Sequence, residues 1–302
     1  MELDLIRHIF EYEAIKELHA LKNYPIQPMC AFLHISRSAY YRWLKQPKSA
    51  QTIFNEHLSD LIRYIHEADN DKGYRRIRDD LVQDYDLPVN DKRVLRICRS
   101  LQIKSTVKHN PHGITKASKH PYHIAKNYLN RNFHADQLNK KWLTDVSEFK
   151  YYEGSRVKKV YLSAILDLAD RRIVSHVISD RNDNKLVFDT FDEAVRLEPD
   201  AHPLFHSDCG FQYTSKQMNN RLKQQGMKQS MSRVARCIDN GPMEGFWGTL
   251  KREKYYRRKF TSRESLVSMI ENYIYYYNNG RYQRCLNSKT PMNVHRELLL
   301  AS

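Results

Sequence analysis

The fold of this chain is decided by the stretch Pro203-Leu204-Phe205-His206-Ser207-Asp208-Cys209-Gly210. Its short apolar run ends in an aspartate and a glycine, a pattern typical of a buried strand that carries a carboxylate at its C-terminal tip. Downstream, Glu244 follows Asp239-Asn240-Gly241-Pro242, where Asp239 or Asn240 can cap a helix that Pro242 begins. We therefore expect one carboxylate at the end of a strand and a second in the first turn of a helix.

A third carboxylate, Asp145, lies in the middle of a strand expected over residues 141–149. Two-metal phosphoryl transfer requires hard oxygen ligands that hold a pair of Mg²⁺ ions about 3.5–4 Å apart. Two strands and a helix can supply that clamp, so Asp145, Asp208 and Glu244 are the candidate catalytic and metal-binding residues. Asp167 and Asp170 also lie near a strand end, but the strand of Asp145 is the first of the expected sheet.

The spacing and flanks of these carboxylates resemble those of the DDE transposases of the IS3 family. Asp208 and Glu244 have 35 residues between them, and the runs around both match the signatures of that family. For this reason Glu244 is preferred to Asp239, which we interpret as the helix cap. The resemblance covers nearly the whole chain but departs at Ala235, where glycine is expected. If that position requires a positive φ, alanine would strain the loop before the catalytic helix and reduce activity.

The resemblance implies an α/β fold, with an RNase H-like catalytic core preceded by helical, helix-turn-helix-like DNA-binding regions. It also implies metal-dependent DNA cleavage at insertion-sequence ends followed by strand transfer. The expected cofactor is Mg²⁺, two ions per site, with Mn²⁺ as a substitute. The expected partners are double-stranded DNA, as terminal inverted repeats and as target, and further copies of the chain on that DNA. A fusion with the product of an upstream reading frame is also expected.

Two other functions share part of this pattern. A regulator of transposition that binds DNA without catalysis would retain the basic character of the chain, and Ala235 is the feature that favours it. The complete set of three carboxylates argues against that hypothesis. An RNase H-like nuclease would share the fold and the metals, but it would cut DNA without joining ends.

The composition indicates a polyanionic partner. The 302 residues include 50 Lys and Arg against 35 Asp and Glu, a net charge of +15, and the isoelectric point is near 9.5. No stretch approaches the length of a membrane span, and the acidic start does not resemble a signal peptide. We therefore expect a cytoplasmic protein associated with the nucleoid and no membrane partner. The five cysteines are scattered without a Cys-x-x-Cys pair, which argues against disulfides and structural zinc.

The first region, residues 1–48, is predicted to be helical. A helix over residues 3–22, a short helix over 28–33 and a helix over 37–45 capped by Ser36 follow the order of a helix-turn-helix reader. In that interpretation Arg37, Tyr41 and Arg42 contact DNA. The alternative is a small helical bundle with Tyr40, Trp43 and Leu44 in its core; the sequence favours neither.

A second helical region follows over residues 49–105, and the resemblance implies DNA contacts there as well. The residues expected to make them are Arg75, Arg76, Lys92, Arg93 and Arg96. Residues 92–135 contain ten Lys or Arg and no acid. We interpret residues 106–138 as an extended basic linker that lies along phosphates, or as a disordered tether that orders on binding.

The catalytic domain is predicted over residues 139–302, with a helical C-terminal tail. Further strands are expected over 159–168, 172–179 and 227–231, and helices over 184–196 and from Thr214 or Ser215 to Gln225. This order is that of an RNase H-like fold. Lys251 and Arg252, on the helix after Glu244, are expected to contact DNA phosphates. The tyrosines of residues 265–277 are interpreted as packing residues rather than nucleophiles.

Overall fold

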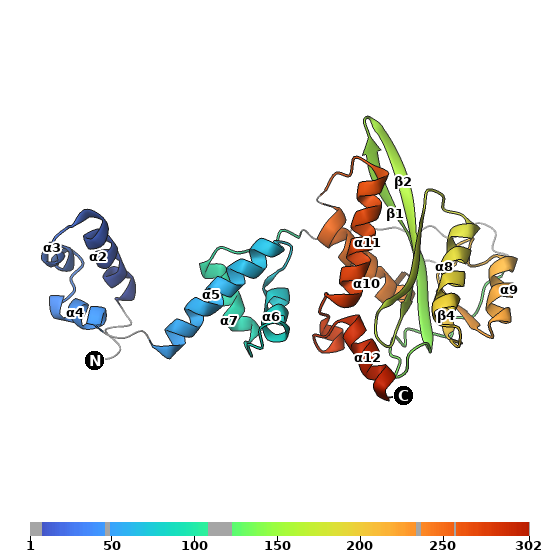
Figure 1. Ribbon diagram of the computed structural model, residues 1–302, viewed down its shortest axis with the longest axis horizontal. Helices are drawn as coiled ribbons and strands as arrows, with labels where there is room; N and C mark the ends of the chain where they lie inside the picture. The colour runs from blue at the N-terminus through green and yellow to red at the C-terminus, as the bar shows by residue number, and fades with distance from the viewer. Residues whose placement is uncertain (1–7, 46–48, 108–122, 234–236, 257, 302) are drawn as a thin grey trace. The chain divides into compact units, whose positions relative to one another are not determined.

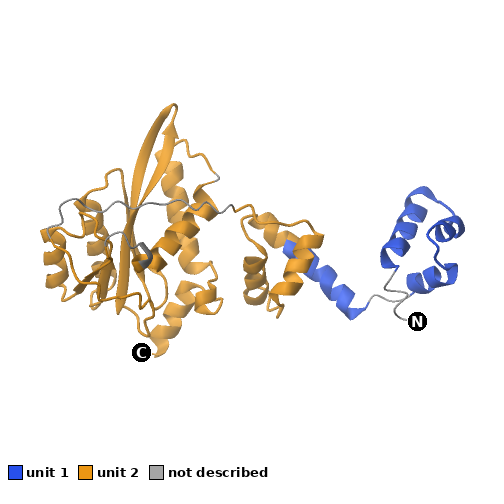
Figure 2. Cartoon of the chain, turned by 180° about the vertical axis from the view of Figure 1, so that it is seen from behind, with its two compact units in different colours: residues 1–62 blue, residues 63–302 orange. Residues whose placement is uncertain are grey.

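The computed structural model describes residues 8–45, 49–107, 123–233, 237–256 and 258–301 (Figure 1). The chain divides into two compact units, Met1–Ile62 and Arg63–Ser302, which Figure 2 shows in blue and orange. Ala235 lies outside the described residues, as do residues 108–122 of the expected linker and residues 46–48 at the first expected boundary. No helix among the described residues is long and apolar enough to cross a membrane.

The first unit contains the three predicted helices, α2 (Ile9–Lys22), α3 (Ile26–Phe32) and α4 (Arg37–Lys45). Their shared core is formed by Tyr12, Ile15 and Tyr40, with Trp43 packed against it. Ser36 Oγ accepts a hydrogen bond from the Ala39 amide at 3.3 Å, which confirms the predicted cap of α4. Leu44, expected in a bundle core, is instead 43% exposed.

The second helical region also forms as predicted. Helix α5 (Ala50–Ala68) spans the division between the units and is followed by α6 (Tyr74–Gln83) and α7 (Asp91–Ser100). Asn90 caps α7 by accepting a bond from the Arg93 amide at 2.8 Å. Ile77 and Leu81 of α6 and Val94 of α7 are completely buried, so the two helices share an apolar contact.

A five-stranded mixed sheet forms the centre of the second unit. Strands β1 (Lys141–Glu153), β2 (Arg156–Asp167) and β3 (Ile173–Ser179) form an antiparallel meander, while β4 (Leu204–Ser207) and β5 (Lys228–Met231) run parallel to β1. The order across the sheet is β3-β2-β1-β4-β5. This arrangement confirms the predicted RNase H-like fold, including the hairpin between the second and third strands.

Helices cover both faces of this sheet. Helices α8 (Asn184–Leu197) and α9 (Lys216–Gln224) lie on one side, and α10 (Gly241–Leu250) and α11 (Arg263–Asn279) lie on the other (Figure 1). Ser215 caps α9 by accepting from the Met218 amide, as predicted. The C-terminal helix α12 (Pro291–Ala301) packs against α11. After Leu250, α10 continues as a π-helical turn (Lys251–Tyr255), which the sequence did not predict.

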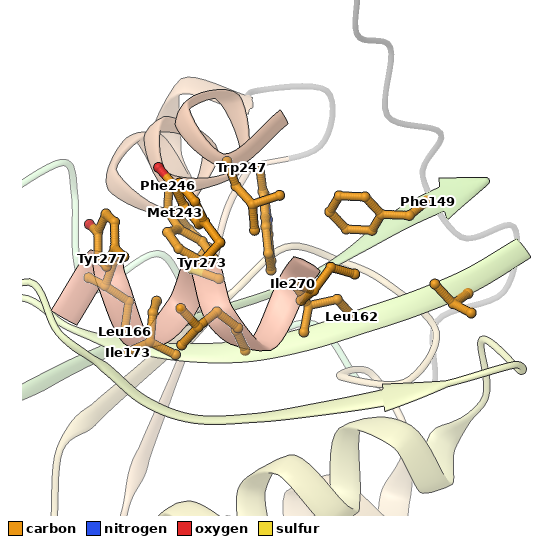
Figure 3. Packing of buried hydrophobic residues seen from close by; sticks show 14 of the residues in the cluster. Phe149, Leu162, Leu166, Ile173, Met243, Phe246, Trp247, Ile270, Tyr273 and Tyr277 are labelled. Atoms are coloured by element: carbon orange, nitrogen blue, oxygen red, sulfur yellow. The ribbon is translucent and has the colours of Figure 1, made fainter. Parts of the chain in front are cut away.

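Residues of β2 contribute to two hydrophobic cores, one on each face of the sheet. Leu162 and Leu166 face α10 and α11 together with Trp247, whereas Ile165 faces the core under α8 and α9. Figure 3 shows Trp247, Phe246, Tyr273 and Ile270 lying over Leu162 and Leu166. A large apolar side chain contributes roughly 1.5–3 kcal/mol when it is fully buried. Tyr273 and Tyr277 are both buried here, which confirms their interpretation as packing residues.

Candidate active site

Asp145 occupies the point on β1 where pairing with β4 ends. Leu143 is the last β1 residue paired with β4, so the side chain of Asp145 lies beyond the C-terminal tip of β4. Its Oδ1 accepts a hydrogen bond from the Val146 amide at 2.8 Å, and its Oδ2 accepts one from Trp247 Nε1 at 3.0 Å. Strand β1 and helix α10 therefore fix this carboxylate from two directions.

Asp208 follows the last residue of β4 and lies in a tight turn. Its Oδ1 accepts a hydrogen bond from the Gly210 amide at 2.9 Å. A Cβ atom at position 210 would lie only 2.9 Å from that same oxygen, so a larger residue here would displace the carboxylate of Asp208. The sequence predicted both the strand end and the glycine that follows it.

His206 joins the active-site ends of β4 and β5. Its Nδ1 lies 2.9 Å from Ser230 Oγ and its Nε2 lies 3.2 Å from Ser232 Oγ. Burial lowers the pKa of His206 to about 4, so the ring is neutral at physiological pH. It therefore adds no charge beside Asp208, and it holds the strand end through two neutral hydrogen bonds.

Glu244 lies in the first turn of α10, as predicted, and is exposed. Asn240, at the start of the helix, donates from Nδ2 to the carbonyl of Thr144 at 3.1 Å. Thr144 directly precedes Asp145, so this one hydrogen bond holds the start of α10 next to the first carboxylate. The sequence did not identify this role, because the two residues are 96 positions apart.

The prediction that Asp239 caps α10 is wrong. Asn240 occupies the cap position and makes no side-chain cap bond, while the completely buried carboxylate of Asp239 binds two arginines. Arg233 Nε lies 2.8 Å from its Oδ2, and Arg131 Nε lies 2.7 Å from its Oδ1. Arg233 first, and then Arg131, hold the pKa of Asp239 well below its usual range. Asp239 thus anchors the loop before α10.

The three candidate carboxylates lie close enough to repel one another. Burial, and then the charge of Asp208, raise the pKa of Asp145 to about 7, and Glu244 adds a smaller effect. Burial raises the pKa of Asp208. Burial and then Asp208 raise the pKa of Glu244. The structure therefore brings together the three residues that the sequence selected, and it places them where their negative charges are costly.

Within the described residues, no ion pair neutralises these three carboxylates. The same part of the chain contains no group of three His, Cys, Asp or Glu side chains that could hold a single ion together. The set is thus an open cluster of oxygen donors with unbalanced negative charge. Such a cluster suits cations that are each held by only some of its members.

Lys251, one of the predicted DNA contacts, lies within reach of the charge of Asp145. Its Nζ lies 4.9 Å from the centre of the Phe149 ring. Burial lowers the pKa of Lys251, while the charges of Asp145 and Glu148 oppose that effect. Arg252, in the same π-helical turn, folds back toward Gly248, where a Cβ atom would lie 3.6 Å from its Nη2.

The other predicted DNA contacts lie on helices outside this site. Arg37 donates to Gln27 at 3.0 Å, and Arg93 is partly buried. The remaining exposed residues of the set are Tyr41, Arg42, Arg75, Lys92 and Arg96. Arg76 differs from them because its guanidinium is bound within the protein, to Tyr276 Oη at 2.8 Å and to Glu253 at 3.2 Å. This placement argues against the DNA contact predicted for Arg76.

Trp247 is a further residue whose contact with the site the sequence did not predict. It lies three residues after Glu244 on α10. The structure shows that its ring is buried in the core while its Nε1 donates to Asp145. The sequence did contain a signal for this contact, because Trp247 carries an N–H donor and lies three residues after a candidate carboxylate.

The chain is similar to known proteins in sequence and in structure. Family models described as "Integrase core domain" match residues 135–237 and 244–299, and a model described as "HTH-like domain" matches residues 54–111. The chain is 33% identical, over 94% of its length and 98% of the relative, to the "Putative transposase InsK for insertion sequence element IS150" of Escherichia coli. It is 29% identical, over 83% of its length and 87% of the relative, to the "Transposase InsF for insertion sequence IS3A" of the same organism. Among solved structures, the HTLV-2 integrase catalytic core domain is 20% identical and covers 53% of this chain and 97% of its own, with a TM-score of 0.41.

Proposed function

The chain belongs to the IS3 family of insertion-sequence transposases, and on that premise we propose that Asp145, Asp208 and Glu244 are its catalytic residues. The family establishes a polynucleotidyl transferase that acts in insertion-sequence transposition. One observation supports the assignment of the chemistry to these three residues. The charge of Asp208 raises the pKa values of Asp145 and Glu244, and the charge of Glu244 raises the pKa of Asp145. Carboxylates kept in such mutual repulsion are typical of functional sites.

We propose that the cofactor is Mg²⁺, in two ions per site, with Mn²⁺ as a substitute. The donors are oxygen atoms, which hard divalent cations prefer, and no described ion pair balances their charge. Asp145, Asp208 and Glu244 would hold the ions. When bound, divalent ions of this kind supply positive charge to a phosphodiester and activate an attacking oxygen.

The side chains of the protein position these carboxylates. Trp247 and the Val146 amide fix the orientation of Asp145, the Gly210 amide fixes Asp208, and Asn240 holds the start of the helix that carries Glu244. Residues held in this way need little reorganisation when DNA binds. Lys251, within reach of the charge of Asp145, is proposed to bind a phosphate beside the reacting bond.

The proposed reaction has two steps at one site. Water hydrolyses a phosphodiester at the end of the element and frees a 3′-hydroxyl group. That hydroxyl then attacks a second phosphodiester, forming one bond while another breaks. No covalent intermediate between protein and DNA is involved, which agrees with the burial of Tyr273 and Tyr277 in the core.

The remaining partners are proposals of the same kind. Double-stranded DNA would be bound at its terminal inverted repeats and at the target, with Tyr41, Arg42, Arg75, Lys92 and Arg96 available at exposed positions. Action as a multimer, and fusion to the product of an upstream reading frame, complete the proposal.

Glu244→Gln tests the proposed catalytic site. The purified chain is incubated with labelled DNA that carries both element ends, with Mg²⁺ or Mn²⁺. Metal-dependent nicking followed by joined products is expected for the native chain. Glu264→Gln, which changes an exposed glutamate in the first turn of α11, is the matched control and should retain both products.

The variant should bind the same DNA and form neither product. Full activity of Glu244→Gln would refute the role of this residue. Cutting by the native chain without joining would instead favour the nuclease hypothesis. Binding without any chemistry, also after fusion to the upstream product, would favour the silent regulator.

A further inference from the structure

A groove of about 710 Å³ lies on the second unit between α9, β5 and residues 123–129. Four lysines line it: Lys126, Lys216, Lys223 and Lys228. No aspartate or glutamate is among the lining residues. A groove with one sign of charge and low-dielectric walls concentrates its field on a ligand of the opposite sign.

The lysines of this groove are free to bind a ligand. All four are exposed, and in the described part of the chain no carboxylate pairs with any of them. Arg221 on the same helix shows the contrast, because it lies 3.2 Å from Asp192. Lys216 and Lys223 are seven residues apart, which places both on one face of α9 at a separation of roughly 10 Å along the helix axis.

Tyr128 adds an aromatic surface to the groove. The Nζ atom of Lys228 lies 3.5 Å from the centre of the Tyr128 ring, and that of Lys126 lies 6.0 Å from it. The amides of Tyr128 and Leu129 both donate to Ser230 Oγ, at 3.0 and 3.1 Å. The segment that carries Tyr128 and Lys126 is therefore fixed to β5, and the ring holds the Lys228 ammonium group in place.

We propose that this groove binds the phosphodiester backbone of duplex DNA outside the active site, without regard to sequence. Lysine is a point charge suited to phosphate, and such contacts supply most non-specific affinity. The groove includes the C-terminal part of the acid-free stretch of residues 92–135. Helix α9 begins at Lys216, eight residues after Asp208, and β5 is the neighbour of β4. Lys228 pairs with Leu204 at the start of β4, whereas Asp208 follows the end of β4, so the groove lies beside the strand that carries Asp208.

This inference rests on the proposed function, because it assumes that DNA occupies the neighbouring active site. The test measures DNA binding without catalysis, so the groove proposal and the proposed function can be refuted independently. The triple variant Lys216→Gln, Lys223→Gln and Lys228→Gln is compared with the control Lys158→Gln, Lys159→Gln and Lys185→Gln. Each control lysine already pairs with a carboxylate, at 2.6, 2.9 and 2.5 Å. The two variants lose the same formal charge.

Binding of a random duplex is measured by fluorescence anisotropy in EDTA over a range of salt concentrations. Loss of three phosphate contacts should reduce the slope of log affinity against log salt by about 2–3 and weaken binding on the order of 10- to 100-fold at about 0.1 M salt. The control should lose less than about threefold. Equal slopes for the two variants would overturn the proposal.

Acetylation of lysines in the native chain provides the second measurement, which no folding defect can affect. Duplex DNA should protect Lys216, Lys223 and Lys228 and leave Lys158 and Lys185 reactive. Absence of protection would overturn the proposal, as would equal protection by single-stranded RNA or by an acidic protein at the same concentration. A native chain that protects these lysines but never cuts DNA would leave the groove established and the proposed chemistry refuted.

Discussion

Asp208→Asn should stabilise the metal-free protein while it abolishes catalysis. Burial and the charge of Asp208 raise the pKa of Asp145 from 3.8 to about 7. One pKa unit corresponds to about 1.36 kcal/mol, so keeping Asp145 ionised in the folded protein opposes folding by on the order of 4 kcal/mol above pH 7. The variant removes the contribution of Asp208 to that penalty, and it also removes the penalty for the partly buried charge of Asp208 itself. Burial is the larger cause for Asp145, so we expect a net gain of about 2 kcal/mol.

The gain depends on pH in a definite direction. A carboxyl group whose pKa is raised by folding binds its proton more tightly in the folded state, so metal-free native protein loses stability as pH rises from about 4 to 7. The advantage of the variant should therefore be full near pH 8 and smaller near pH 5. The asparagine carbonyl can still accept from the Gly210 amide, so the turn is preserved.

Urea unfolding in EDTA measures this difference, with Asp200→Asn as control because that aspartate is exposed outside the cluster. The control should change the free energy of unfolding by less than about 0.5 kcal/mol. Excess Mg²⁺ should raise the free energy of unfolding of the native chain much more than that of Asp208→Asn. The native chain should then be the more stable of the two. A variant that is less stable than the native chain in EDTA near pH 8 would refute the reasoning, since repulsion would then not be the dominant effect.

Three further changes test the surroundings of the site. Trp247→Phe removes the hydrogen bond to Asp145, so the free energy of unfolding should fall by about 1 kcal/mol. The pKa of Asp145 should rise further, which moves the pH profile of cleavage to higher pH. An unchanged profile would contradict this role of Trp247. Arg76→Met removes one partner of the buried Glu253 carboxylate, which should cost about 2–3 kcal/mol in urea unfolding; a cost below about 0.5 kcal/mol would show that the pair contributes little. Asp239→Asn should lower the free energy of unfolding by about 2 kcal/mol. Because folding lowers the pKa of Asp239, its contribution to stability is present above about pH 4 and lost at lower pH. The thermal unfolding temperature of the variant should therefore fall less at low pH than that of the native chain.

The sequence predicted those features of the site that local signals determine. The apolar run before Asp208, the glycine after it and the helix start before Glu244 each mark one element end. The interval of 35 residues then selected Glu244 over Asp239. Every strand of the sheet was located for the same reason, because apolar runs bounded by turn residues are local patterns.

The contacts that hold the site could not be predicted in this way. Asp239 carries a good cap signal, but its carboxylate binds Arg131, which is 108 residues away. Trp247 donates to a carboxylate 102 residues away. A DNA contact was expected for Arg76 because the family resemblance implies one in this region, yet its guanidinium binds Glu253 and Tyr276 within the protein. Pairings across such distances depend on tertiary packing, which overrides the local preference of each residue.

The pairing of the carboxylates around α10 explains how the site tolerates its own repulsion. Five residues before Glu244, Asp239 is buried and bound by two arginines; nine residues after it, Glu253 is buried and also bound by two arginines. Both ends of the helical segment are therefore fixed by ion pairs, whereas Glu244 between them has no such partner among the described residues. Removing one arginine from such a buried pair is strongly destabilising. The anchors thus hold Glu244 near Asp145 and Asp208 against a repulsion that would otherwise separate them, and they leave its carboxylate available for a cation.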